Sequence, residues 1–159
     1  MPIAMKNKLF IAIVILCVVG TALSGVSLRN HYSTSTTDYC DLGETFNCDL
    51  VNRSIFSRFF GVPVALIGLV GYVFLGAISY VKWYPAKVLR LVAAAAGLAF
   101  AVYLAYIEAR ILAVWCLLCI GSLTTISFIT VLSGFALRKG EAVQPLPELS
   151  GDQLQENLR

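Results

Sequence analysis

Residues 9–28 read LFIAIVILCVVGTALSGVSL, twenty consecutive residues without a charge. A helix needs about 20 apolar residues to cross the roughly 30 Å hydrocarbon core of a bilayer, so this stretch is long enough to span a membrane. Three further stretches, 61–81, 89–112 and 116–137, have similar length and character. The sequence therefore predicts an all-α membrane protein, in which residues 1–139 form a bundle of four transmembrane helices.

The composition excludes several other classes of protein. Of 159 residues, 58% are hydrophobic and only 13% are charged, which rules out a water-soluble enzyme and a disordered chain. Twelve Lys and Arg against nine Asp and Glu cannot form the dense basic face that nucleic-acid binding needs. The size leaves room for one domain.

The first span has a rival interpretation as a cleavable signal peptide. Lys6 and Lys8, the apolar run that follows and the small residues around Ala22 and Ser24 suit such a peptide. The apolar character continues through Leu28, which favours a retained span. Either interpretation leaves the next loop on the same side of the membrane.

The basic residues predict how the spans are oriented, because Lys and Arg beside short loops stay on the cytoplasmic side. Four basic residues fall on one side: Arg29, Arg53, Arg58 and Arg110. Seven fall on the other: Lys6, Lys8, Lys82, Lys87, Arg90, Arg138 and Lys139. Both termini, the tail 140–159 and the turn at Trp83–Pro85 should therefore be cytoplasmic. The loop 29–60 and the connection 110–115 should face the periplasm, a lumen or the exterior of an inner or cell membrane.

Three features near the outer face and in span three complete the predicted architecture. Apolar residues recur at helical spacing from Asp49 to Phe60, which predicts a short amphipathic helix on the membrane surface over the mouth of the bundle. Small residues from Ala93 to Ala109 recur every four positions, which is typical of close helix packing. Glu108 and Arg110, at the outer end of this span, are expected to reach the membrane interface.

Four of the five cysteines fall on the outward face. Cys40 and Cys48 lie in the loop, and Cys116 and Cys119 form the motif Cys-Leu-Leu-Cys at the outer start of span four. Disulfides persist in oxidising compartments, and four cysteines permit three pairings, which the sequence leaves open. Cys17, in the middle of span one, is expected to be a small buried apolar residue.

A Cys-x-x-Cys motif at a helix N-terminus indicates redox chemistry. The unpaired N–H groups and the helix dipole stabilise a thiolate, and Cys116 gains most from them. Cys119, one turn deeper, faces the bundle interior or lipid, where it can meet a hydrophobic oxidant. Two alternatives remain: static disulfides that clamp the loop to the bundle, and a zinc site of four thiolates, which the wide spacing of Cys40 and Cys48 disfavours.

The ordered combination of motifs resembles the vitamin K epoxide reductase family, in particular its prokaryotic, quinone-reducing, stand-alone members. The motifs are Cys40-Asp41, Cys48 to Ser54, Phe60 to Gly68, and Cys116 to Cys119. The resemblance implies four helices around a quinone, with the loop pair relaying electrons to the membrane pair. It also implies that Cys40 exchanges with a partner protein, that Cys48 forms a mixed disulfide with Cys116, that Cys119 faces the quinone, and that Ser54 can bond a quinone oxygen.

Two departures from the family pattern refine this expectation. Leu123 stands where vertebrate members have a tyrosine, which puts vitamin K epoxide reduction in doubt. The tail is too short for the thioredoxin-like domain that some members carry, so the partner should be a separate thioredoxin-like or DsbA-like protein. The predicted function is a membrane thiol oxidoreductase that reduces a ubiquinone-, menaquinone- or vitamin K-type quinone and generates disulfides. Alternatives are a vitamin K quinone or epoxide reductase, and a non-enzymatic four-span protein with structural disulfides.

Overall fold

The computed structural model describes residues 3–33, 46–81 and 84–141, and long helices make up most of them. The predicted tail 140–159 lies almost wholly outside the described residues, as do Cys40 and part of the turn at Trp83. In chain order the elements are α1 (Ile3–Tyr32), α2 (Cys48–Arg53), the 3-10 turn η1 (Ile55–Ser57), β1 (Arg58–Phe59), β2 (Val62–Pro63), α3 (Val64–Ser79), α4 (Tyr84–Ile107), the π-helix η2 (Glu108–Leu112) and α5 (Leu117–Glu141).

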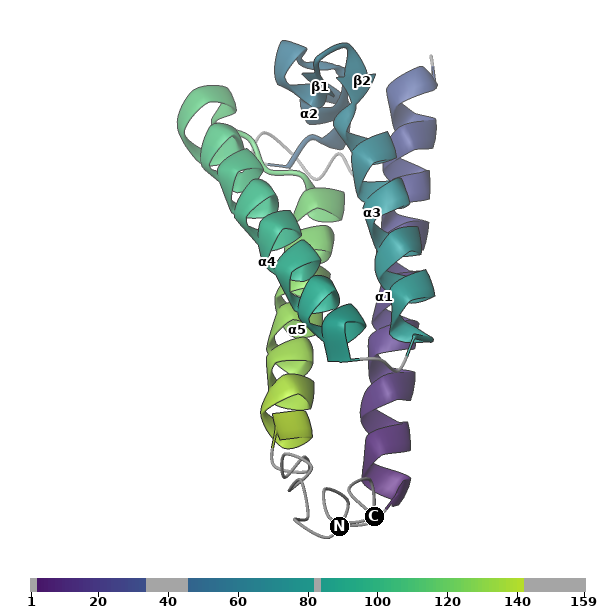
Figure 1. Ribbon diagram of the computed structural model, residues 1–159. Helices are drawn as coiled ribbons and strands as arrows, with labels where there is room; N and C mark the ends of the chain where they lie inside the picture. Colours follow the sequence, from purple (N-terminus) through teal and green to yellow (C-terminus); the bar gives the residue numbers. More distant parts are fainter. Residues whose placement is uncertain (1–2, 34–45, 82–83, 142–159) are drawn as a thin grey trace, which may run out of the picture.

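The long helices of the described chain pack in a ring, in which α1 contacts α3, α3 contacts α4, α4 contacts α5, and α5 returns to α1 (Figure 1). At one end of the ring, α2 and the β1–β2 hairpin lie beside the C-terminal end of α1 and the start of α3. The described start of α1 and the end of α5 lie at the opposite end.

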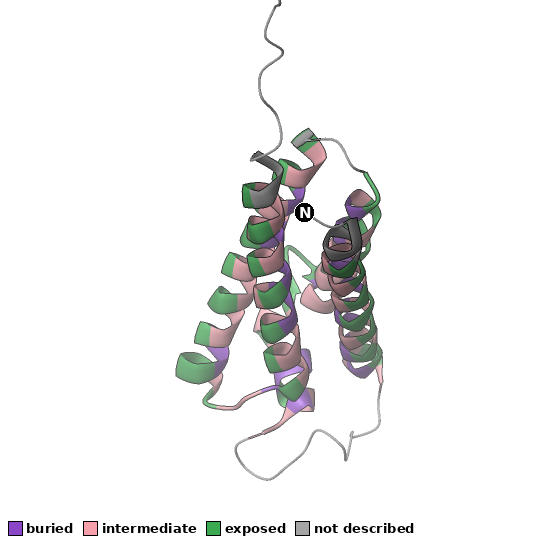
Figure 2. Ribbon diagram, turned by 90° about the horizontal axis from the view of Figure 1, so that it is seen from below, coloured by how far each residue is buried: buried purple, intermediate pink, exposed green. Residues whose placement is uncertain are grey.

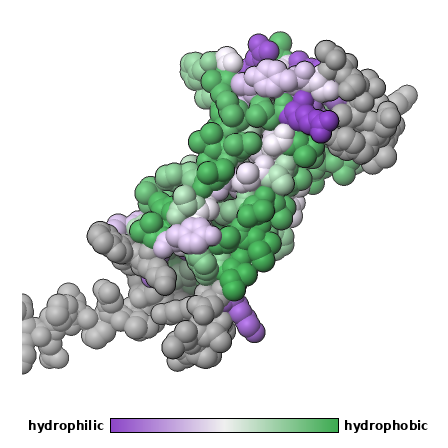
Figure 3. Space-filling view, turned by 90° about the vertical axis from the view of Figure 1, so that its right-hand side faces the viewer, coloured by the Kyte–Doolittle hydropathy of each residue, from purple (hydrophilic) through white to green (hydrophobic). Residues whose placement is uncertain are grey.

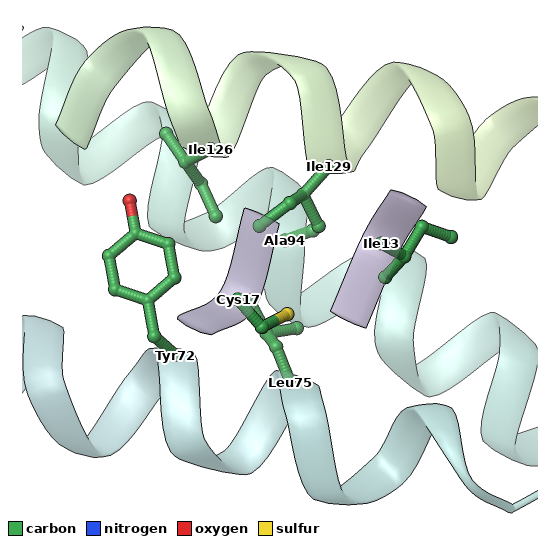
Figure 4. Packing of buried hydrophobic residues seen from close by; sticks show 7 residues of the cluster. All are labelled: Ile13, Cys17, Tyr72, Leu75, Ala94, Ile126 and Ile129. Carbon is green, nitrogen blue, oxygen red and sulfur yellow. The ribbon is translucent and has the colours of Figure 1, made fainter. Parts of the chain in front are cut away.

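The centre of the ring is a small apolar core to which every long helix contributes (Figure 4). Its buried members are Ile13, Cys17, Tyr72, Leu75, Ala94, Ile126 and Ile129. Cys17 is a free thiol that is only 4% exposed, which confirms its prediction as a small buried residue. The outer sides of the helices are exposed, as Figure 2 shows, and they carry many large hydrophobic side chains.

The described helices include three that are long and apolar enough to cross a membrane, over Lys8–Tyr32, Pro85–Leu112 and Leu117–Arg138. Helix α3 is also apolar but has only 16 residues. Figure 3 shows hydrophobic side chains over the middle of one face of the molecule, with hydrophilic atoms near its ends. The fold is therefore mostly helical, with three to four apolar helices of a kind that spans a bilayer.

The segment from Asp49 to Phe60 differs from the single amphipathic helix predicted for it. Helix α2 ends at Arg53, because Ser54 has an extended backbone with ψ 162° and its hydroxyl donates to the Val51 carbonyl oxygen at 2.8 Å. Such local side-chain bonds compete with helical hydrogen bonds. The chain then forms η1 and an antiparallel hairpin in which Phe59 pairs with Val62. Its tight turn needs positive φ, which Gly61 adopts at 82° without steric cost.

Candidate functional site

The site is built at the end of the ring where α1 ends and α5 begins, and Cys48 is its first component. Cys48 is the first residue of α2, whose N-terminus is capped by Asn47, the side-chain oxygen of which accepts the Leu50 N–H at 2.8 Å. Helix α2 is held on α1 by Asn52, whose side-chain oxygen accepts the Ser27 hydroxyl at 2.7 Å. His31, also on α1, contacts the backbone oxygen of Asn52. These contacts fix the position of Cys48.

The second component, Cys116, is brought to Cys48 by the connection between η2 and α5. Ala113 adopts a left-handed backbone with φ 53° and ends the π-helix. Trp115 then pairs with Phe46, and its backbone oxygen accepts the Asn47 N–H at 3.1 Å. Because Asn47 and Trp115 each precede a cysteine, this bond aligns the two thiol positions. The Cys116 carbonyl accepts the Ile120 N–H at 3.0 Å, so Cys116 is the N-cap of α5.

The sulfur atoms of Cys48 and Cys116 lie 3.3 Å apart. Both residues are buried, with 1% and 0% of their surface exposed, and the apolar side chains of Val51, Leu112 and Leu118 pack around them. Cys48 is disulfide-bonded, whereas Cys116 and Cys119 are free thiols. The structure therefore brings three of the four predicted cysteines together, and the fourth, Cys40, lies outside the described residues.

The surroundings of Cys116 favour its thiolate. Its pKa is lowered, first because the Cys119 thiol donates a hydrogen bond to it, and further because the backbone N–H groups of Cys119 and Leu118 point at the sulfur. Burial and the negative charge of Glu108 oppose this shift without cancelling it. Cys116 is thus the more nucleophilic thiol of the pair, as its place at a helix N-terminus predicts.

Glu108 does not reach the membrane interface, so that prediction is wrong. It is 3% exposed, and its Oε2 accepts the backbone N–H of Cys116 at 3.1 Å. It begins the π-helix η2, and π-turns are frequent at functional sites. The sequence did carry a signal: Glu108 is an ionisable residue inside an apolar span, which is functional by default.

A cavity of about 350 Å³ lies next to the thiols, inside the ring of helices. Cys119 and Leu118 form part of its wall from α5, and α1, α3 and α4 supply the rest. The lining is mostly apolar and includes the rings of Phe74 and Phe100. The volume lies within the range of about 300–1,000 Å³ that is typical of small-molecule sites.

The cavity also has polar groups that the sequence did not single out. Tyr72 lines it, and the Tyr72 hydroxyl reaches toward α5, where it donates to the Ser122 carbonyl oxygen at 2.9 Å (Figure 4). Ser24 and Ser27 of α1 and Ser122 of α5 add hydroxyl groups to the wall. Tyr72 was missed because a lone tyrosine in an apolar span carries no motif.

The small residues of span three and Ser54 have other places relative to the cavity than the sequence predicted. Ala93, Gly97 and Ala101, part of the ridge predicted for helix packing, also line the cavity, because their small side chains leave space there. Ser54, the predicted quinone-binding hydroxyl, is not part of the cavity wall. It lines a surface depression on α2 beside Asn47, and the proton of its hydroxyl is used in the bond to Val51.

Comparison with known protein families matches residues 11–133 to the vitamin K epoxide reductase family. The match covers most of the chain, so the protein belongs to this family. No curated protein matches the chain. Family membership together with the long apolar helices identifies an integral membrane oxidoreductase, of a family that acts on quinones.

Proposed function

We propose that the protein takes electrons from a reduced thioredoxin-like partner and passes them through Cys40 and Cys48 to Cys116 and Cys119, and then to a quinone. The products are a quinol and a disulfide in the partner, which supports oxidative protein folding. One observation carries the proposal. The thiol pair Cys116 and Cys119 touches Cys48 on one side and the wall of an apolar cavity on the other.

The internal exchange step is supported by the sulfur geometry. The Cys48 and Cys116 sulfur atoms, 3.3 Å apart, are within the 3–3.5 Å or so that brings reacting atoms close to attack. Exchange requires a thiolate: attack of Cys48 on Cys116 forms the mixed disulfide and releases the Cys119 thiol. The lowered pKa of Cys116 then makes it a good leaving group when Cys40 attacks Cys48 of that mixed disulfide. With Cys48 bonded and the membrane pair free, the electrons reside on Cys116 and Cys119, which is the form that is ready to reduce an acceptor.

The cavity fits a quinone ring in size and chemistry. Its walls are aliphatic and aromatic, with the hydroxyl groups of Ser24, Tyr72 and Ser122 among them. A bound quinone supplies an acceptor for two electrons and two protons. These match the two electrons and two protons that the two thiols lose when they form a disulfide. Cys119 is the thiol that contacts this cavity, which agrees with its place one turn into α5.

The same geometry supports a proposal for the membrane orientation. We propose that all four long helices span the bilayer, with α2 and the hairpin over the outer mouth of the ring. Cys48 and Cys116 lie at that mouth, beside the end of α1. The excess of Lys and Arg at the opposite end of the chain's helices favours cytoplasmic termini and a site on the periplasmic or exterior face.

The proposal is tested by quinone reduction in detergent, with a reduced dithiol or thioredoxin-like protein as electron donor and ubiquinone, menaquinone and vitamin K analogues as acceptors. Cys119→Ala should abolish turnover. Gly97→Leu should block the cavity, because a side chain at Gly97 enters the wall beside Ile126. The matched control is Gly134→Leu, a position on α5 where an added Cβ meets nothing within 4 Å.

Turnover that is lost in Cys119→Ala and Gly97→Leu but kept in Gly134→Leu supports the proposal. A wild-type protein that is folded yet reduces none of these quinones refutes it. Turnover that survives Cys119→Ala also refutes the electron path.

A further inference from the structure

We propose that Glu108 is a positioning residue, which holds the backbone of Cys116 so that the Cys116 sulfur stays within reach of the Cys48 sulfur. This inference rests on the proposed function and deepens it, because it assigns a residue to the exchange between the two cysteine pairs. The cysteine motifs do not include Glu108, and Glu108 contributes no atom to the bonds that are exchanged.

Cys116 ends a short connection between two helices. The π-helix η2 is followed by Ala113, whose backbone is left-handed at φ 53°, and α5 begins only at Leu117. The Cys116 carbonyl accepts the Ile120 N–H, but the N–H of Cys116 itself lies before the first turn of α5. An N–H at the start of a helix has no carbonyl of that helix to bond, so its partner must come from elsewhere.

Glu108 supplies that partner from η2, which continues α4. Its Oε2 accepts the Cys116 N–H at 3.1 Å, and the residue is 3% exposed. A capping-box glutamate makes the same kind of bond from within its own helix, whereas here the acceptor comes from the preceding one. An ionisable side chain inside an apolar span is costly and marks a functional position. The bond ties the start of α5 to the end of α4.

A second bond holds the same peptide group from its other side. The carbonyl of this group belongs to Trp115 and accepts the Asn47 N–H at 3.1 Å, while its N–H belongs to Cys116 and donates to Glu108. The two polar groups of a trans peptide lie in one plane and point in opposite directions. With both bonded, the plane cannot rotate, and the Cys116 sulfur is held 3.3 Å from that of Cys48.

The exchange reaction depends on this placement. The Cys48 thiolate attacks the Cys116 sulfur of a Cys116–Cys119 disulfide, a Cys48–Cys116 bond forms, and the Cys116–Cys119 bond breaks. The electron pair of the broken bond stays on the Cys119 sulfur. Cys48 loses one proton on becoming the thiolate and Cys119 takes one up, so the step needs no further reactant. Reacting atoms must lie about 3–3.5 Å apart, so a peptide group that is free to rotate makes the exchange less efficient.

The placement is measured by how Cys48 divides between two partners in full-length Cys119→Ala protein in detergent. Without Cys119, a single disulfide per chain exchanges between Cys40–Cys48 and Cys48–Cys116, and no reagent has to enter the buried site. After acid quenching and unfolding, the free thiols are alkylated and the two disulfides are quantified by mass spectrometry. Their ratio reports how well Cys116 is held against Cys48, and it needs neither a quinone nor a partner protein.

Two substitutions in this background separate the acceptor oxygen from the rest of the side chain. Glu108→Leu removes the acceptor and should shift the ratio about tenfold from Cys48–Cys116 towards Cys40–Cys48, because a buried N–H without a partner is costly. Glu108→Gln keeps an oxygen that accepts the N–H and should restore the ratio of the parent protein. Arg110→Gln, at an exposed position of the same π-helix, is the matched control and should leave the ratio unchanged.

A merely structural role predicts a lower Tm for Glu108→Leu with an unchanged disulfide ratio, and that result would overturn the proposal. A Gln variant shifted as far as the Leu variant would overturn it too, because the acceptor oxygen would then not matter. Should Glu108→Leu fail to fold, Glu108→Met, which has only a weak acceptor, takes its place. A parent protein that forms no Cys48–Cys116 disulfide refutes the exchange path and this role with it. Absence of quinone turnover alongside the expected ratios refutes only the proposed quinone reaction.

Discussion

The hydrogen bond from Cys119 to Cys116 leads to a prediction that needs no quinone. Cys119→Ala removes the thiol that contributes most to the lowered pKa of Cys116, so this pKa should rise. Cys119→Ser keeps an O–H donor at the same place and should preserve most of the shift. The two variants therefore separate the hydrogen bond from the other effects of losing the sulfur.

The expected size follows from the strength of such bonds. A hydrogen bond to a charged group contributes about 1.5–3 kcal/mol, and a thiol is a weak donor, so the lower end applies. One pKa unit corresponds to about 1.4 kcal/mol. The pKa of Cys116 should therefore rise in Cys119→Ala by the contribution of this bond. At any pH below both pKa values, the thiolate fraction then falls about tenfold.

The assay is the ultraviolet absorbance of the Cys116 thiolate in the reduced protein as a function of pH, taken as the difference from Cys116→Ala, because Cys116 is fully buried and an alkylating reagent would not reach it. A lowered pKa means that the wild-type absorbance reaches its plateau at a lower pH than that of an ordinary thiol. As the pH falls below the pKa, the thiol is protonated and the absorbance declines. Alanine and serine variants with the same profile, or an alanine variant with as much thiolate as the wild type at pH 7, would refute the reasoning.

Three further substitutions test the scaffold around the site. Gly20→Ala places a Cβ against the ring of Tyr72 and should lower the free energy of unfolding by about 1–3 kcal/mol, seen as a lower Tm in detergent. In the control Gly25→Ala the nearest atom to the added Cβ is 4.0 Å away, so the Tm should not fall. Asn47→Ala removes the cap of α2 and should lower the stability of the protein by about 1 kcal/mol. Added to Cys119→Ala, it should also slow formation of a Cys48–Cys116 disulfide, and an unchanged rate would show that the cap does not hold Cys48. Ala113→Val forces a β-branched residue into φ 53° and should lower the Tm by more than Ala113→Gly does; the opposite order would contradict the strain argument.

The helices could be predicted from the sequence because a helix that spans a bilayer needs apolar side chains along its whole length. The expected spans 9–28, 89–112 and 116–137 overlap α1, α4 with η2, and α5 almost completely. Span 61–81 is shorter in the structure, since Gly61 and the hairpin precede α3. A hairpin of two-residue strands is too short to show an alternating pattern, so it was predicted as helix.

The site was predictable where a motif marked it and not where packing created it. The spacing of Cys116 and Cys119 places both at the start of a helix, which is a local property of the chain. The hydrogen bond of Glu108 to the Cys116 backbone depends on how η2 and α5 meet after the left-handed turn at Ala113. No motif spacing in the sequence predicts that turn. The cavity likewise depends on the packing of four helices, although the small residues Ala93 and Gly97 indicated close contact.

The shortness of α3 has a consequence for how the protein sits in lipid. Sixteen residues rise about 24 Å, which is less than the roughly 30 Å of a bilayer core. The hairpin next to it carries exposed apolar side chains, among them Phe59, Phe60 and Val62, which lengthen this flank of the molecule. Helices that are too short for the bilayer are accommodated by local thinning. We therefore expect the surrounding membrane to be thinnest along α3, the flank that also forms a wall of the cavity.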